Sequence, residues 1–258
     1  MKISIVTISF NQARYLRECI DSVLSQKEDR FELEYIVVDP GSSDGSRELI
    51  ESYGDSIIRV FDLDNGPADG LSKGFSKATG DIFGFLNSDD YLLPGALRNV
   101  HNHYNNTDLN HFVTGGGYID RGVSKNKVYP SQLSLYRYLV GASTVFQQGT
   151  FFPGRLYKKV GGFNTSNTTC WDGELFANFL AAGHPHCVIR SELAGFRLHP
   201  DSISGSGRLE ELYLKDNLRM FKLFLGREPN AADKLLNLFF RIEKRVHFFA
   251  NRVKSSYR

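Results

Sequence analysis

Short apolar runs alternate, over the first hundred positions, with stretches whose apolar residues recur at helical spacing. Strands are expected at residues 3–8, 35–38, 57–61 and 82–86, and helices at residues 15–24, 47–53 and 71–78. This alternation predicts an α/β fold with a mostly parallel, Rossmann-like central sheet and helices on both faces. In such sheets ligands bind outside the carboxyl ends of the strands, so the binding site is expected there.

Three polar loops that follow predicted strands are expected to meet at that edge: residues 9–11, 39–46 and 87–90. In the second loop, Gly41 and Gly45 suit a close approach of the backbone to a ligand. A glycine-rich turn that only reverses the chain is the alternative, so this loop alone does not establish a site.

The third loop places two adjacent carboxylates, Asp89 and Asp90, soon after an apolar run. Adjacent carboxylates repel each other and resist burial, and a hard divalent cation such as Mg²⁺ or Mn²⁺ would resolve that conflict. The alternative is a turn that caps a helix starting near Pro94. On these residues alone the metal site and the helix cap are equal alternatives.

The second half of the chain has weaker periodicity. Short strands at residues 111–114 and 118–119 flank Gly115-Gly116-Gly117, which predicts a tight turn or, alternatively, a backbone that approaches a sugar closely. A later helix begins near Cys170, and Asp172 at its start is expected either to cap it with a low pKa or to act as a base.

The last segment, residues 231–258, is amphipathic and basic. From Leu235 on, its apolar residues recur at spacings of three and four, and six Lys or Arg residues stand against Glu243 alone: Arg241, Lys244, Arg245, Arg252, Lys254 and Arg258. This pattern is typical of a helix that lies on an anionic membrane surface. A helix packed on the core with a solvated basic face is the alternative.

Composition narrows the class of protein. The chain has 258 residues, 41% of them apolar and 23% charged, with a net charge of +2, so no global field demands nucleic acid. An odd count of three cysteines without a CxxC motif indicates a reducing compartment. The N-terminus shows no secretion-signal pattern, and no apolar run approaches the roughly 20 residues of a membrane span. We therefore expect a cytoplasmic protein.

Six ordered segments carry a resemblance to a known family: residues 5–11, 22–26, 37–46, 64–74, 78–82 and 86–90. Together they resemble the family 2 glycosyltransferases of the GT-A fold, of the bacterial polysaccharide or O-antigen type. The resemblance covers about the first hundred residues and continues more weakly to about residue 205. It implies a GT-A catalytic domain over 1–205, with a nucleotide-sugar half (1–100) and an acceptor half (101–205), followed by amphipathic helices over 206–258.

The resemblance also implies roles for individual residues at the donor site. Asp39 matches the acidic residue that contacts the nucleotide base, with Ser9 and Asn11 beside the base and ribose. The remaining residues assigned to the donor are Gly41, Asp69, Lys73, Asn87, Ser88 and Arg197, the last as a phosphate contact.

The segment Asn87-Ser88-Asp89 stands where the family has its metal-binding Asp-X-Asp motif. Because Asn87 replaces the first aspartate, Asp89 becomes the main carboxylate for Mn²⁺ or Mg²⁺, with Asp90 in support. His199 matches a late histidine that reaches the metal or the diphosphate; an unremarkable surface histidine is the alternative.

Asp172 matches the family's general base, and Glu174 is the second candidate. The implied reaction is an inverting transfer of a sugar from a UDP-, GDP- or dTDP-sugar to a hydroxyl of a glycan or lipid-linked (polyprenyl diphosphate) saccharide. A nucleotidyltransferase is a second hypothesis, but the loop after the first strand, residues 9–14, lacks the glycine that triphosphate binding favours. A catalytically silent binding protein is a third; it would be expected to lose Asp89 or Asp172, and both are present.

Overall fold

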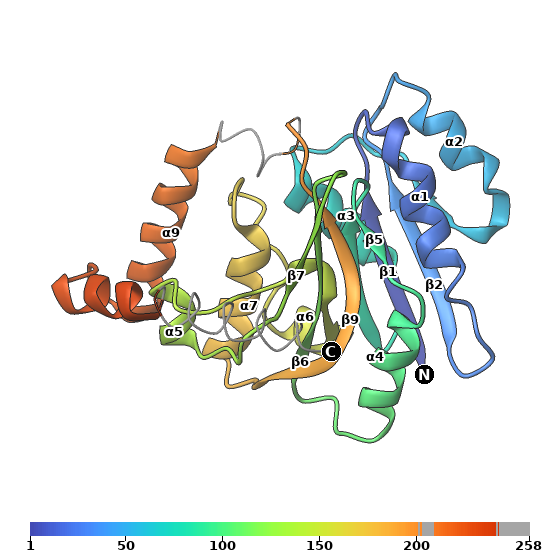
Figure 1. Ribbon diagram of the computed structural model, residues 1–258. Coiled ribbons are helices and arrows are strands. Elements are labelled where there is room, and N and C mark those ends of the chain that lie inside the picture. The colour runs from blue at the N-terminus through green and yellow to red at the C-terminus, as the bar shows by residue number, and fades with distance from the viewer. Residues whose placement is uncertain (201, 203–208, 241, 243–258) are drawn as a thin grey trace.

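The computed structural model describes residues 1–200, 202, 209–240 and 242, which form a twisted sheet with helices on both sides (Figure 1). The first half runs β1 (Lys2–Ile8), α1 (Ala13–Leu24), β2 (Glu32–Val38), α2 (Ser46–Ser52), β3 (Ile58–Val60), α3 (Pro67–Lys77), β4 (Ile82–Asn87), β5 (Tyr91–Leu92) and α4 (Ala96–Asn105). All four strands expected in the first hundred residues are present, and the predicted alternation is confirmed.

The second half runs β6 (Phe112–Asp120), β7 (Lys125–Val128), α5 (Leu135–Leu139), β8 (Thr150–Pro153), α6 (Gly154–Lys159), α7 (Trp171–Ala181), β9 (His186–Arg197) and α9 (Glu210–Leu225). Residues 231–240 form a further helix, whereas 241 and 243–258, the rest of the predicted membrane segment, lie outside the described residues. Figure 1 shows α9 beside α7, on the opposite side of the molecule from α1 and α2. Within the described part, no helix combines the length and apolar character that a membrane crossing requires.

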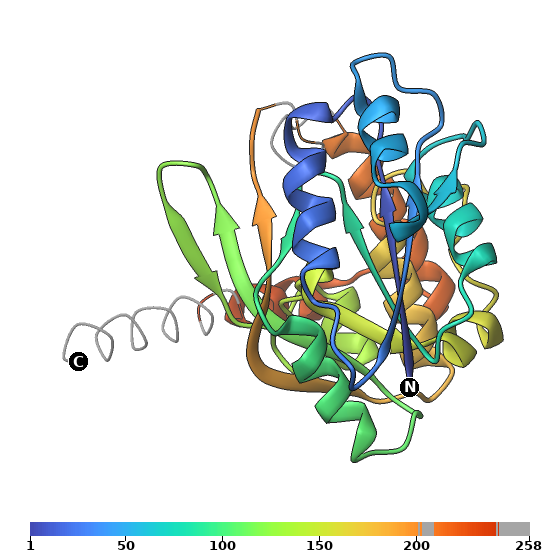
Figure 2. The same ribbon diagram turned by 90° about the vertical axis from the view of Figure 1, so that its right-hand side faces the viewer.

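The strands pair in the order β3-β2-β1-β4-β8-β6-β9-β5, and β7 joins β6 in a hairpin that projects from the sheet (Figure 2). The first four strands of this order are parallel to one another. In the second half β6 and β9 are parallel, while β8 and β5 pair antiparallel to their neighbours. Because β1, β2 and β4 are parallel neighbours, the residues that follow them emerge at one edge of the sheet.

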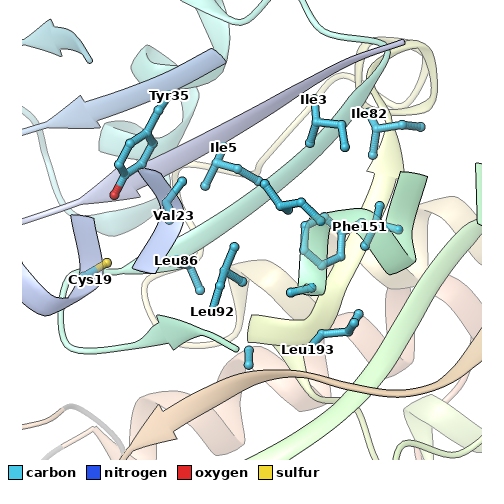
Figure 3. Close-up of a cluster of buried hydrophobic side chains, with 14 of the residues drawn as sticks. Ile3, Ile5, Cys19, Val23, Tyr35, Ile82, Leu86, Leu92, Phe151 and Leu193 are labelled. Carbon is cyan, nitrogen blue, oxygen red and sulfur yellow. The ribbon is translucent and has the colours of Figure 1, made fainter. Parts of the chain in front are cut away.

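Alternate residues of the central strands fill two separate cores. On one face Ile3 and Ile5 pack with Leu16 and Val23 of α1, in a cluster that Figure 3 shows together with Phe151 of β8. On the other face Val6, Ile36 and Val38 pack with α3. An aromatic group from α3, β4, β8, α6, the loop after α6 and α7 completes that core: Phe75, Phe83, Phe85, Phe152, Tyr157, Phe163 and Trp171. Burial on both faces explains why these strands are continuous apolar runs.

The glycine triplet at residues 115–117 lies inside β6, so the prediction of a turn there is wrong. A β-carbon on Gly115 would lie 2.4 Å from the side chain of Leu193, and one on Gly117 would lie 2.0 Å from the carbonyl oxygen of Ala194. The glycines therefore let β6 lie against an irregular stretch of β9, where the register shifts on either side of Gly116.

Candidate functional site

The loops after β1, β2 and β4 surround one cavity of about 670 Å³. Its lining is formed by Ile8, Ser9, Phe10, Gln12, Pro40, Leu63, Asp64, Asn65, Gly66, Pro67, Asn87, Ser88, Asp89, Trp171, Phe196 and Ser202. The volume falls within the roughly 300–1,000 Å³ range of small-molecule sites. The predicted convergence of strand ends is thus realised.

Asp39 directly follows β2 and is fully buried; it is not itself among the lining residues, but the next residue, Pro40, is. Its Oδ1 accepts hydrogen bonds from the main-chain N–H groups of Gly41 (2.9 Å) and Ser42 (2.8 Å). Its Oδ2 is buried and has no partner among the described residues, and the same is true of the Ser9 hydroxyl. Leaving a buried carboxylate oxygen unpaired is costly, so Oδ2 is a free hydrogen-bond acceptor among the described residues.

Asn11 connects the loops after β1 and β2 beside the cavity, although it is not among the lining residues. It has a left-handed backbone (φ 52°), its side chain accepts from the N–H of Ser43 (2.9 Å), and its own N–H donates to the Ser42 hydroxyl (2.8 Å). Gly41 also has a positive φ, 127°, which explains its presence. These contacts tie the loop after β1 to the loop after β2.

Asp69 and Lys73 lie one turn apart on α3 and form an ion pair of 2.9 Å. Asp69 also accepts from the N–H of Asn65 (2.9 Å), and Lys73 donates to the carbonyl of Leu63. Neither side chain is among those that line the cavity. Their contacts instead hold the loop at 63–67, which does line it.

Asp64 is a site residue that the sequence reasoning did not single out, although it begins one of the matched segments. It lines the cavity, and its Oδ1 accepts from the N–H of Gly66 (3.0 Å). Burial raises the pKa of the Asp64 carboxyl, and the nearby carboxylates of Asp69 and Asp39 act in the same direction. Its place at the start of the matched segment 64–74 was the signal that the sequence offered.

The loop after β4 contributes Asn87, Ser88 and Asp89 to the wall of the cavity. Oδ2 of Asp89 lies 3.0 Å from Nε2 of His199, and both side chains are largely buried. Two ligand atoms at right angles, each about 2.1 Å from one octahedral ion, would lie about 3.0 Å apart. Nδ1 of His199 is buried without a partner among the described residues.

Asp89 and His199 fit a divalent cation for which the protein would supply only some of the ligands. Within the described ranges no group of three or more His, Cys, Asp or Glu side chains could hold a metal ion. Ions such as Mg²⁺ are often bound by one or two carboxylates, with substrate phosphates and water completing the shell. A histidine nitrogen in the set favours Mn²⁺ over the harder Mg²⁺.

Asp90 and Arg197 have other contacts than those predicted. Asp90 is fully buried; its Oδ2 accepts from Gln148 (3.0 Å) and its Oδ1 from the main-chain N–H of Arg197 (3.0 Å). Burial, and then the charge of Asp89, raise the pKa of Asp90. The Arg197 guanidinium donates to the carbonyl of Asp89 (3.0 Å) and to Glu18 (2.7 Å). In this structure both side chains support the 87–90 turn, and their roles toward a ligand stay predictions.

The two candidate bases at the start of α7 differ in their surroundings. Both carboxylate oxygens of Glu174 are engaged, by a two-point ion pair with Arg219 (3.0 and 2.5 Å) and by Asn164 and Asn167. Burial alone would raise the pKa of Glu174, but the contacts with Arg219 and the two asparagines lower it. These contacts argue against Glu174 as the base.

Asp172 is partly buried beside Trp171, which lines the cavity. Burial raises the pKa of the Asp172 carboxyl, against the opposing effect of the N–H groups of Gly173 and Asp172 itself at the helix start. A raised pKa makes a carboxylate a stronger base. The expectation of a capping residue with a low pKa is therefore replaced by a carboxylate suited to accepting a proton.

Solved structures share this architecture. TarS of S. aureus in complex with UDP-GlcNAc matches with a TM-score of 0.70 at 18% identity, over 93% of this chain and 71% of that one. The mannosyltransferase PcManGT of Pyrobaculum calidifontis, in complex with GDP-Man and Mn²⁺, matches with a TM-score of 0.64 at 15% identity, over 91% and 67%. The fold is thus the GT-A type of α/β fold found in glycosyltransferase structures.

Sequence comparison identifies the family. The model of glycosyl transferase family 2 matches residues 4–159. An uncharacterized glycosyltransferase of Rickettsia typhi is 30% identical over 192 residues, 69% of this chain and 58% of the relative. One of Mycobacterium tuberculosis is 28% identical over 258 residues, 94% of this chain and 98% of the relative. The chain spans less than two thirds of its Nostoc and Rickettsia typhi relatives, 34% and 58%. The chain belongs to glycosyl transferase family 2.

Proposed function

We propose that this chain transfers a sugar from a nucleoside-diphosphate sugar to an acceptor hydroxyl, with the help of a divalent cation and with inversion at the anomeric carbon. One observation carries the proposal. A buried, unpartnered carboxylate oxygen of Asp39 lies directly before the lining residue Pro40, and the Asp89–His199 pair has its aspartate in the wall of the same cavity. The first suits a nucleobase and the second a metal-bound diphosphate.

The base end favours nucleotides that carry an imino N–H. Uracil, thymine and guanine each present such a group, and the free Oδ2 of Asp39 is placed to accept its hydrogen bond. UDP-, dTDP- and GDP-sugars are therefore the candidate donors. The structural neighbours solved in complex with UDP-GlcNAc and with GDP-Man support this range.

The diphosphate end is assigned to Asp89 and His199. A divalent cation, when bound there, would neutralise the charge that develops on the leaving diphosphate. Asp89 supplies an anionic oxygen and His199 a ring nitrogen 3.0 Å away, while Asn87 and Ser88 form the adjacent wall. Asp69 and Lys73 keep the opposite loop in place.

Asp172 is assigned as the general base. It would take the proton from the acceptor hydroxyl as the oxygen attacks the anomeric carbon from the face opposite the diphosphate. The raised pKa of its carboxyl and its place next to a lining residue, Trp171, support the role. Displacement from the opposite face gives inversion.

We assign the acceptor to a glycan or a saccharide on a lipid, as in the assembly of bacterial surface polysaccharide at the inner face of the cell membrane. The helix at 231–240 supports this proposal. Its residues Leu236 and Phe240 pack against Val140, Ala142 and Phe221, yet an apolar row on its other side is exposed by 54–70%: Leu235, Leu238, Phe239 and Ile242. Such a face next to a basic sequence suits an anionic lipid surface.

A thermal-shift screen of UDP-, GDP- and dTDP-sugars with Mn²⁺ tests the donor, followed by an assay for release of the nucleoside diphosphate. A donor at 100 times its Kd would add about 2.7 kcal/mol to the free energy of unfolding. Stabilisation by one nucleotide class, with diphosphate release, is expected. Absence of a shift with every donor, or release of pyrophosphate from nucleoside triphosphates, would contradict the proposal.

A further inference from the structure

The guanidinium of Arg197 is held inside the protein although it ends next to the cavity. It lies between two aromatic rings, 4.8 Å from the ring centre of Tyr15 and 5.3 Å from that of Tyr91. Its side chain is only 13% exposed. Arginine stacked in this way keeps a fixed orientation and loses little entropy on making further contacts.

The hydrogen bonds of Arg197 meet the 87–90 turn at two points. Nη1 donates to the main-chain carbonyl of Asp89, and the main-chain N–H donates to the carboxylate of Asp90, each at 3.0 Å. Gln148 holds the second oxygen of Asp90 at 3.0 Å. The 87–90 turn is thus fixed at the Asp89 carbonyl by the stacked guanidinium and at the Asp90 carboxylate by Gln148 and the main chain of Arg197.

His199 reaches the same aspartate from two residues further along the chain. Its Nε2 lies 3.0 Å from the Asp89 carboxylate, and its ring packs 4.9 Å from Tyr15, which also stacks on Arg197. Asp89 is therefore contacted at two points from the end of β9 and the residues just after it. Arg197 binds its carbonyl, and His199 binds its carboxylate. The distance between the two candidate metal ligands, Asp89 and His199, depends on both contacts.

We propose that Arg197 is a positioning residue that sets the distance between Asp89 and His199 for the divalent cation and that does not itself bind the donor. This inference rests on the proposed function of the Asp89–His199 pair. It assigns to Arg197 an effect on metal affinity that a simple surface ion pair would not have.

The ion pair with Glu18 provides the contrast. Glu18 is 61% exposed, and exposed ion pairs contribute little. The contact with the Asp89 carbonyl is sheltered between two rings. Loss of the Glu18 carboxylate should therefore leave metal binding unchanged, whereas loss of the planar fork of Arg197 should weaken it.

The test compares Arg197→Lys with Glu18→Gln as the matched control. Binding of Mn²⁺ in the presence of UDP is measured by the electron paramagnetic resonance signal of free Mn²⁺, and binding of UDP without metal by calorimetry. For Arg197→Lys we expect the Kd of Mn²⁺ to rise about tenfold, as for one lost hydrogen bond. Metal-free UDP binding should stay within about twofold of wild type, and turnover should recover at saturating Mn²⁺. Glu18→Gln should match wild type in all three.

Unchanged Mn²⁺ affinity in Arg197→Lys would overturn the inference, and so would an equal loss of metal-free UDP binding, which would make Arg197 a donor ligand. Tyr91→Leu removes one of the two stacked rings and provides a second variant if the lysine variant does not fold; it should weaken Mn²⁺ binding in the same direction. Failure of the wild-type protein to bind Mn²⁺ with UDP would refute the proposed metal site itself, a result distinct from the two above.

Discussion

Replacement of Asp39 by asparagine changes one atom at the base end of the cavity. The Oδ1 position is fixed because it accepts from the N–H groups of Gly41 and Ser42, at 2.9 and 2.8 Å. The asparagine oxygen must occupy that position, so its NH₂ group takes the place of the buried, unpartnered Oδ2. An acceptor aimed at the base becomes a donor.

The expected magnitude follows from one hydrogen bond to a charged group. Such a bond contributes about 1.5–3 kcal/mol, and the new NH₂ group would face the imino N–H of uracil without an acceptor. The Kd of UDP should therefore rise about 30-fold or more, at 1.4 kcal/mol for each factor of ten. Cytosine carries an acceptor nitrogen in place of that N–H, so CDP should bind Asp39→Asn better than it binds the wild-type protein.

Calorimetry with UDP and CDP in the absence of metal measures this effect without involving Asp89. Asp62→Asn is the matched control, since Asp62 is exposed and is not among the residues that line the cavity. Equal affinity of wild type and Asp39→Asn for UDP, or an unchanged ratio of UDP to CDP affinity, would refute the role of the free carboxylate oxygen.

Three other predictions concern the base, the fold and the C-terminal surface. Asp172→Asn should lower kcat by roughly 10² or more while UDP binding survives. Because the pKa of Asp172 is raised and the base must be ionised, wild-type kcat/KM should begin to fall, as the pH is lowered, at a pH above the usual pKa range of aspartate. This acidic fall should be absent from the pH profile of the variant. Burial alone would raise the pKa of Glu34, but hydrogen bonds from Ser4 and Thr79 and the contact with Lys2 lower it to about 2. The contribution of Glu34 to the free energy of unfolding is therefore complete above pH 4.5 and is lost as the pH falls toward 2. Glu34→Gln should lower the free energy of unfolding at neutral pH by about 3 kcal/mol in urea titrations, and an unchanged midpoint would contradict this. Replacing the exposed row at 235, 238, 239 and 242 by serine should abolish flotation with anionic vesicles without lowering metal-free UDP affinity, and retained flotation would remove the membrane proposal.

The local parts of the site could be predicted from the sequence. The strand–helix alternation and the rule that parallel strands share a carboxyl edge were enough to bring Ser9 and Asp89 to one cavity, with Asp39 directly before the lining residue Pro40. Each of them lies within two residues of a strand end, so that only the order of the strands had to be right.

The parts that depend on distant partners could not be predicted. Asp90 and Asp89 are adjacent in sequence and chemically equal. Only the Asp90 carboxylate, however, accepts hydrogen bonds from Gln148 and from the main-chain N–H of Arg197, which lie 58 and 107 residues away. In the sequence, Glu174 is as good a candidate base as Asp172. Only the structure shows that Arg219, on α9, binds both of its carboxylate oxygens.

The glycine triplet shows the same limit at the level of the backbone. Glycines in a row are typical of a turn, and only the position of β9 against β6 shows that they are required to make room for Leu193 and Ala194. A pattern within one segment carries no information about which segment packs against it.

The central claim, that one ligand spans Asp39 and a metal held by Asp89, is tested most directly by the linkage between UDP and Mn²⁺. Calorimetry would measure the Kd of UDP with and without saturating Mn²⁺, for the wild-type protein and for Asp89→Asn. The account predicts that Mn²⁺ tightens UDP binding at least tenfold in the wild type, about 1.4 kcal/mol or more, and that this gain is lost in Asp89→Asn while metal-free affinity is kept. Equal UDP affinity with and without Mn²⁺ in the wild type, or an undiminished gain in the variant, would contradict it.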